Sequence, residues 1–190
     1  IIKPLIASAA LEQNIIEPEK KINCQGKIII KNPWYDPRDP KSGQKEWIYH
    51  DWKTHGLTNI RKAIAESCNV YFYIIGGGYE NFIGLGATAI KNYLKLFGWG
   101  EKTLIDLPEE GKGSLPDIDE DWTLGQTYNL SIGQGPFSVT PLQVATAFSA
   151  IANGDKLFQP QIVKAIVDSQ KNVVEEIKPE IIRENFIDQK

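Results

Sequence analysis

Two stretches of the chain carry apolar residues at the spacing of an amphipathic helix. The first covers residues 1–11 with Lys3 in its opening turn, and we expect this helix to end near Asn14. The second covers residues 87–97 and stops at Gly98, which suits the C-terminal cap of a helix. The apolar stripe of the second helix is more typical of a core face than of a ligand site.

A third helix has start and stop signals that agree. Thr140 is a suitable N-cap, and Pro141 suits the first helical position. The run 142–152 follows, and Asn153 and Gly154 come directly after it. These signals predict a helix that ends at residue 152.

One further helical run is interrupted by three polar or reactive side chains. The run starts after Thr58, the expected cap, and ends at the glycines 76–78. Ser67, Cys68 and Asn69 lie in the middle of it, although such side chains compete with the backbone hydrogen bonds of a helix. The sequence therefore predicts a break or kink here. A polar notch in an apolar wall is a candidate site, and a simple capped helix end is the structural alternative.

Residues 17–56 follow neither a helical nor a strand pattern for most of their length. They are rich in Pro, Gly, Asp and aromatic residues, and only the run 27–31 is typical of a strand. We therefore expect a long irregular insertion. Loops of this length in a compact domain are usually functional or held by another part of the structure.

Strand signals gather toward the end of the chain. The runs 161–168 and 172–177 flank a short polar turn and predict a β-hairpin. We expect a mixed α/β (α+β) fold in which a mainly helical part, residues 1–125, packs against residues 126–190, which supply a helix and strands of an antiparallel sheet. The cleft between the two parts is the expected place of the site.

Composition excludes several classes of protein. The 190 residues are 42% hydrophobic and 24% charged, an ordinary globular composition for one domain or most of one. The formal net charge of −3 gives no basic patch for nucleic acid. No apolar run approaches the roughly eighteen residues that span a bilayer. Because the chain contains no Met and opens without a signal-peptide pattern, we expect it to be a fragment.

Five separated motifs, in order along the chain, resemble a class B penicillin-binding protein of the cell-elongation type. They are the helix start at Lys3 and Pro4 and the runs 51–56, 67–69, 131–135 and 140–143. The resemblance extends to about Lys178. It implies the penicillin-binding protein/serine β-lactamase-like transpeptidase fold and identifies this chain with the central part of the transpeptidase domain.

The resemblance also implies an activity, the D,D-transpeptidation of peptidoglycan. In that family a nucleophilic Ser attacks a stem peptide, and the acyl-enzyme then reacts with the amine of a neighbouring stem peptide. β-Lactams acylate the same Ser. By resemblance, Lys3 is the base of a Ser-x-x-Lys motif, Ser67 is a proton-relaying hydroxyl, and Asn69 holds the donor peptide.

Two motifs of that family are expected outside this chain. The nucleophilic Ser would lie immediately before Ile1, and the Lys-Ser/Thr-Gly motif, which does not occur after Asn69, would lie beyond Lys190. The alternative with the same fold is a serine β-lactamase or a β-lactam sensor. Asn69 counts against the class D β-lactamases, which resemble the sensors. A non-catalytic cell-wall scaffold is the alternative of a different class.

The implied partners and location follow from the same resemblance. The partners are peptidoglycan stem peptides, β-lactam antibiotics, a cell-wall polymerase and the elongation machinery, with no nucleic acid. The implied location is the periplasmic side of the bacterial inner membrane, with a membrane anchor upstream of this chain. No organic cofactor is expected.

Four potential metal ligands lie around the interrupted helix. Cys24 belongs to the insertion, Cys68 to the polar notch, and Asp51 and His55 to the segment just before the helix. Two thiolates, an imidazole and a carboxylate suit a tetrahedral zinc ion, which would pin the insertion to the helix. The alternatives are a Cys24–Cys68 disulfide and a His55 that only hydrogen-bonds a loop carbonyl, and His50 and Asp36 are alternative ligands.

Overall fold

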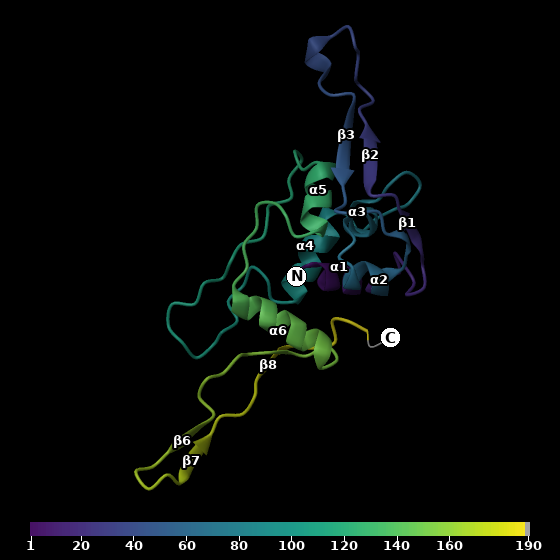
Figure 1. Cartoon of the computed structure of the whole chain (residues 1–190). Helices are drawn as coiled ribbons and strands as arrows, with labels where there is room; N and C mark the ends of the chain where they lie inside the picture. The colour runs from purple at the N-terminus through teal and green to yellow at the C-terminus, as the bar shows by residue number, and fades with distance from the viewer. Residues whose placement is uncertain (189–190) are drawn as a thin grey trace.

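The computed structural model describes residues 1–188, which form six α-helices, one 3-10 helix and eight short strands (Figure 1). The helices are α1 (Lys3–Glu12), α2 (Ile60–Ala65), α3 (Asn69–Gly77), α4 (Ala87–Leu96), α5 (Leu124–Ser131), α6 (Pro141–Ala152) and the 3-10 helix η1 (Pro40–Ser42). The strands are β1 (Ile22–Cys24), β2 (Lys27–Lys31), β3 (Glu46–His50), β4 (Gly56–Thr58), β5 (Leu157–Phe158), β6 (Ala165–Val167), β7 (Val173–Glu176) and β8 (Ile181–Arg183). None of the helices in residues 1–188 is long and apolar enough to cross a membrane.

Helix α3 is the centre of the core. Its residues from Val70 to Gly76 are all buried, as expected of a helix that is apolar on every side. Helices α1, α4 and α5 pack around it (Figure 1). A Cβ atom on Gly76 would overlap the Ser131 hydroxyl, so this glycine lets α3 and α5 approach closely.

The helices predicted from periodicity and caps are confirmed. Helix α1 ends two residues before the expected Asn14, and α4 and α6 cover the predicted runs. At the start of α6, Gln143 N donates to Thr140 Oγ1 at 3.1 Å and Thr140 N donates to Gln143 Oε1 at 2.8 Å. These two hydrogen bonds form a capping box.

Helix α5 was not predicted, because polar residues occupy much of its length. A local signal was nevertheless present, since Thr123 and Gln126 form a second capping box. The cap predicted for α2 was wrong by one residue. Asn59 Oδ1 accepts a hydrogen bond from Lys62 N, whereas Thr58 is the last residue of β4 and its hydroxyl donates to the Gly56 carbonyl.

The strand predicted at residues 27–31 is confirmed as β2, but the insertion is more regular than expected, because β1, β3 and the start of β4 were not predicted. Strand β1 pairs with β4, and β2 pairs with β3 to form a two-stranded arm that projects from the body (Figure 1). At its base, the Tyr49 ring lies 4.9 Å from the Tyr128 ring and 5.9 Å from the Tyr73 ring. The strand signal of residues 46–50 was weak because much of β3 is exposed.

The predicted hairpin is confirmed as β6 and β7, and β5 pairs with β8. The mixed α/β character is confirmed as well. The hairpin projects away from the helices (Figure 1), and the strands of residues 1–188 form four separate two-stranded sheets. The described residues therefore do not form the expected larger sheet against which the helical part would pack, because β6 and β7 pair only with each other.

Candidate active site and metal cluster

Lys3, Ser67 and Asn69, the three residues predicted to be catalytic, lie in direct contact. Lys3 Nζ donates to Ser67 Oγ at 2.9 Å, to Asn69 Oδ1 at 2.6 Å and to the Ser67 carbonyl oxygen at 2.7 Å. Lys3 comes from the first turn of α1, and the other two residues flank the start of α3. The three protons of the ammonium group therefore have three acceptors.

The environment of Lys3 favours the loss of its proton. The side chain is buried, with 7% of its surface exposed. Burial lowers the pKa of Lys3 below its usual value, although the electrostatic effects of Asp51 and Cys68 oppose this change. A lowered pKa is what a lysine needs to accept a proton near neutral pH.

The predicted break at Ser67 is a Schellman motif followed at once by a new helix. Ser67 N donates to the Ile64 carbonyl, and Cys68 N donates to the Ala63 carbonyl. Ser67 has a φ of +52°, the left-handed conformation that this motif requires. Cys68 then caps α3, because its Sγ accepts a hydrogen bond from Tyr71 N at 3.4 Å. The capped helix end and the polar notch are thus the same feature.

The four predicted metal ligands converge beside this turn. The ligand atoms of Cys24, Asp51, His55 and Cys68 all lie within 4.8 Å of one another. Asp51 Oδ2 is 3.4 Å from Cys24 Sγ, 3.3 Å from Cys68 Sγ and 3.5 Å from His55 Nδ1. Both cysteines are buried and free. Two sulfurs, one nitrogen and one oxygen form a donor set that fits tetrahedral zinc.

The surroundings of the cluster orient its members. His55 Nε2 lies 3.3 Å from the Glu66 carbonyl oxygen, which can only accept, so this contact favours a proton on Nε2, while Nδ1 faces the cluster 3.4 Å from Cys24 Sγ. Burial opposes the ionisation of Asp51, but hydrogen bonds from the backbone of Val70, Asn69 and Trp52 and from the Cys68 side chain together lower its pKa. Burial raises the pKa of the Cys68 thiol.

Sequence reasoning missed a second role of Asp51. Its Oδ2 accepts a hydrogen bond from Val70 N at 2.9 Å, in the first turn of α3. Asp51 therefore links the metal cluster to the helix that positions Asn69. Motif 131–135 lies beside the start of α1, because a Cβ atom on Gly133 would lie 3.2 Å from Ile2 Cγ2.

The alternative ligands lie elsewhere. His50 ends β3 and is exposed, and the Asp36 carboxylate pairs with Arg38 near the tip of the arm. The tripeptide at residues 41–43 has the letters of a Lys-Ser-Gly motif, but it forms η1 and the following glycine, not an edge strand.

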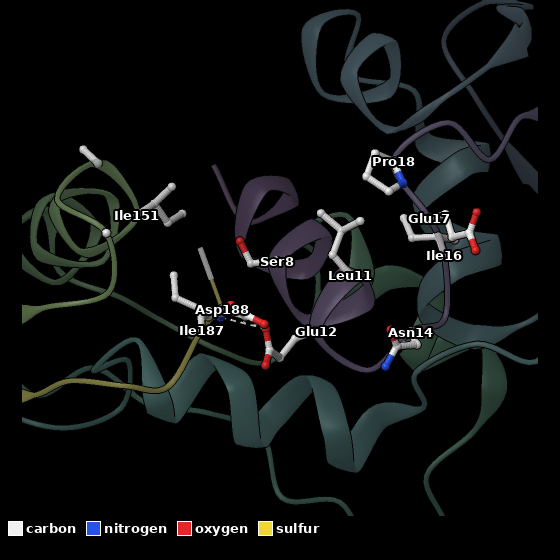
Figure 2. Close-up of a pocket in the computed structure, with 12 residues that line it drawn as sticks. Ser8, Leu11, Glu12, Asn14, Ile16, Glu17, Pro18, Ile151, Ile187 and Asp188 are labelled. Atoms are coloured by element: carbon white, nitrogen blue, oxygen red, sulfur yellow. Dashed lines mark hydrogen bonds between the residues drawn. The ribbon is translucent and has the colours of Figure 1, made fainter. Parts of the chain in front are cut away.

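A cavity of about 580 Å³ lies between the C-terminal half of α1, the end of α6 and the last described residues (Figure 2). Asp188 N donates to Glu12 Oε2 at its edge. Lys3, Ser67, Asn69 and the metal ligands do not line this cavity. The cavity is therefore separate from both clusters.

The chain matches the family model described as "Penicillin binding protein transpeptidase domain" over residues 1–190, and it belongs to this family. It is similar to the peptidoglycan D,D-transpeptidases named MrdA of Haemophilus influenzae and Acinetobacter baumannii, with 34% and 32% identity over 87% and 86% of this chain. It covers 24% and 23% of those two proteins. The chain thus spans about a quarter of the length of the curated relatives that it matches.

Solved structures confirm the transpeptidase fold. Penicillin-binding protein 3 of Mycobacterium tuberculosis, complexed with aztreonam, is 28% identical with a TM-score of 0.71, and the match covers 95% of this chain and 36% of that chain. Penicillin-binding protein 2 of Helicobacter pylori, in complex with MreC, is 30% identical with a TM-score of 0.67, and the match covers 92% of this chain and 30% of that chain.

Proposed function

We propose that the intact protein is a peptidoglycan D,D-transpeptidase of the cell-elongation type that acts through a serine acyl-enzyme. Family membership and the MrdA relatives support this proposal. The observation that carries it is the contact of Lys3 Nζ with Ser67 Oγ and Asn69 Oδ1, because it joins an amine, a hydroxyl and an amide at one site.

Each of these groups has a role in the proposed reaction. With a nucleophilic Ser directly before Ile1, a spacing of three residues in a helix puts Lys3 on the same face as that hydroxyl. Lys3 then takes the proton of the nucleophile, and Ser67 passes a proton toward the leaving amine. Because Asn69 Oδ1 accepts from Lys3, its Nδ2 remains free to donate to a carbonyl of the donor peptide.

The same proposal includes partners and a location. The substrates are stem peptides, and β-lactams acylate the nucleophile. The solved complexes with aztreonam and with MreC support β-lactam binding and an association with the elongation machinery. We assign the domain to the periplasmic side of the inner membrane, anchored by another part of the protein.

The function is tested by labelling the intact protein with a fluorescent penicillin. A stable covalent adduct is expected, and Lys3→Ala should slow its formation by about 10² to 10⁴. Lys21→Ala, at an exposed position, is the matched control. Rapid release of the label would indicate a β-lactamase. The absence of any adduct would indicate a non-catalytic scaffold.

We also propose that Cys24, Asp51, His55 and Cys68 hold a structural zinc ion. The convergence of the four ligand atoms and the orientation of His55 support this site. The ion would join β1 and the segment before β4 to the turn at Ser67, and so pin the insertion to the active-site helix.

Elemental analysis of protein purified without added metal tests the zinc site. About one zinc per chain is expected. His55→Ala should lose most of it, because one of the four ligands is missing. His50→Ala, the other histidine of the chain, should keep it. A metal-free parent protein with an unchanged melting temperature after chelation would refute the site.

A further inference from the structure

We propose that Cys24 and Cys68 are also a redox modification site, in which a small peroxide closes the metal-free thiol pair into a disulfide that disturbs the contacts of Lys3 with Ser67 and Asn69. This inference rests on the proposed zinc site in one respect, because the bound ion would protect the two thiols from oxidation. It rests on the proposed transpeptidase function because acylation by penicillin is the activity that the disulfide would lower.

The geometry allows this bond to form. The two sulfurs lie against the same oxygen, Asp51 Oδ2, at 3.4 and 3.3 Å. All ligand atoms of the cluster, both sulfurs included, lie within 4.8 Å of one another. A disulfide is about 2.05 Å long, so the sulfurs must approach each other by less than about 3 Å. Both belong to short elements, since β1 has three residues and Cys68 lies in the turn between α2 and α3.

The surroundings restrict which oxidant can react. Both thiols are fully buried, so a protein-sized oxidant cannot reach them. The segment that contacts the pair, residues 51–55, is exposed at Trp52 and Lys53. A small peroxide therefore needs only a local opening of this segment.

The chemistry balances with hydrogen peroxide as the oxidant. His55 Nδ1, 3.4 Å from Cys24 Sγ, accepts the thiol proton and then gives it to the hydroxide that leaves the peroxide. The sulfur of Cys24 attacks peroxide and becomes a sulfenic acid, and one water leaves. The sulfur of Cys68 then attacks that sulfur, its proton goes to the departing hydroxide, and a second water leaves. Two thiols and one peroxide give one disulfide and two waters, so two electrons pass from sulfur to peroxide.

The position of Cys68 couples this bond to the active site. Its Sγ is the N-cap acceptor of α3, through Tyr71 N. It stands between Ser67 and Asn69, whose side chains both accept from Lys3. Movement of this sulfur toward Cys24 removes the cap and displaces the turn. A displacement of about 1 Å in a catalytic group can cost on the order of 10² in rate.

The test uses the intact protein, stripped of metal by a chelator and treated with hydrogen peroxide. Mass spectrometry should show a cross-linked peptide pair containing Cys24 and Cys68, lighter by two hydrogens. The rate of penicillin labelling should fall by about tenfold or more, because a catalytic group is displaced. Reduction of the disulfide with dithiothreitol should restore the rate. Protein loaded with zinc should resist the same treatment.

Cys24→Asp is the matched variant, because it keeps a metal-ligand type but removes one thiol. Its labelling after peroxide, relative to its own untreated sample, should change less than twofold. Cys24→Ser serves if the aspartate variant does not fold. The absence of the cross-linked pair would overturn the inference, and so would a cross-link without loss of labelling. A parent protein that takes no penicillin before treatment would count against the proposed function, while the mass spectrum still decides on the disulfide.

Discussion

The helices around α3 and the arm formed by β2 and β3 are held in different ways. In the helical region, whole side chains such as Phe72 and Tyr71 are buried, and Lys3 is enclosed with its three acceptors. The arm is held mainly by backbone pairing and by turns near its tip, where Asn32 Nδ2 donates to the carbonyls of Ser42 and Gln44. Trp34 on the arm is 81% exposed. Substitution of the same residue type should therefore have a much larger effect on stability or activity in the helices than on the arm.

The largest expected difference concerns buried aromatic rings. Phe72→Ala should lower the free energy of unfolding by about 3 to 5 kcal/mol, because the ring is fully buried and a cavity remains. Trp34→Ala should change it by no more than about 0.5 kcal/mol, since the side chain is exposed. Urea unfolding of the intact protein measures both. Equal effects would remove the distinction between the two regions.

The rate of acylation should also respond differently to substitutions in the two regions. Ser67→Ala should slow the reaction with penicillin by about 10², because it removes the proposed relay hydroxyl beside Lys3. Ser42→Ala, on the arm, removes a hydroxyl that bonds only to backbone carbonyls and should leave the rate unchanged. Stopped-flow acylation provides the measurement. A Ser67→Ala rate within twofold of the parent would leave no relay role for that hydroxyl.

The smallest difference concerns helix caps. Asn59→Ala removes the N-cap of α2 and should cost about 1 kcal/mol of unfolding free energy. Asp39 caps η1 in the same way, but this helix has only three residues, and none of them is buried. Asp39→Ala should therefore have a smaller effect. Thermal unfolding of both variants gives the comparison, and a larger loss for Asp39→Ala would show that the arm contributes more to the fold than its exposure indicates.

Local signals explain which elements could be predicted. Helix α6 has an N-cap, a Pro at its first position and a polar stop, and all three act within one or two turns of the backbone. The break at Ser67 was predicted for the same reason. Within the insertion, β2 was predicted. Strand β3 was missed because it pairs with β2 across the arm tip, and most of its side chains contact solvent. Exposed strands carry no alternation of apolar and polar residues to detect.

The main helices, the interruption at residues 67–69, the hairpin near the end and the resemblance to a transpeptidase family could all be predicted from the amino-acid sequence. The distance of 2.9 Å between Lys3 Nζ and Ser67 Oγ, across 64 positions of the chain, came from the folded structure. The folded structure also places the sulfurs of Cys24 and Cys68 against the same oxygen, Asp51 Oδ2. The physical reason is that caps and periodicity act between near neighbours, whereas contacts between distant segments depend on how the buried faces of the helices and the paired strands pack together.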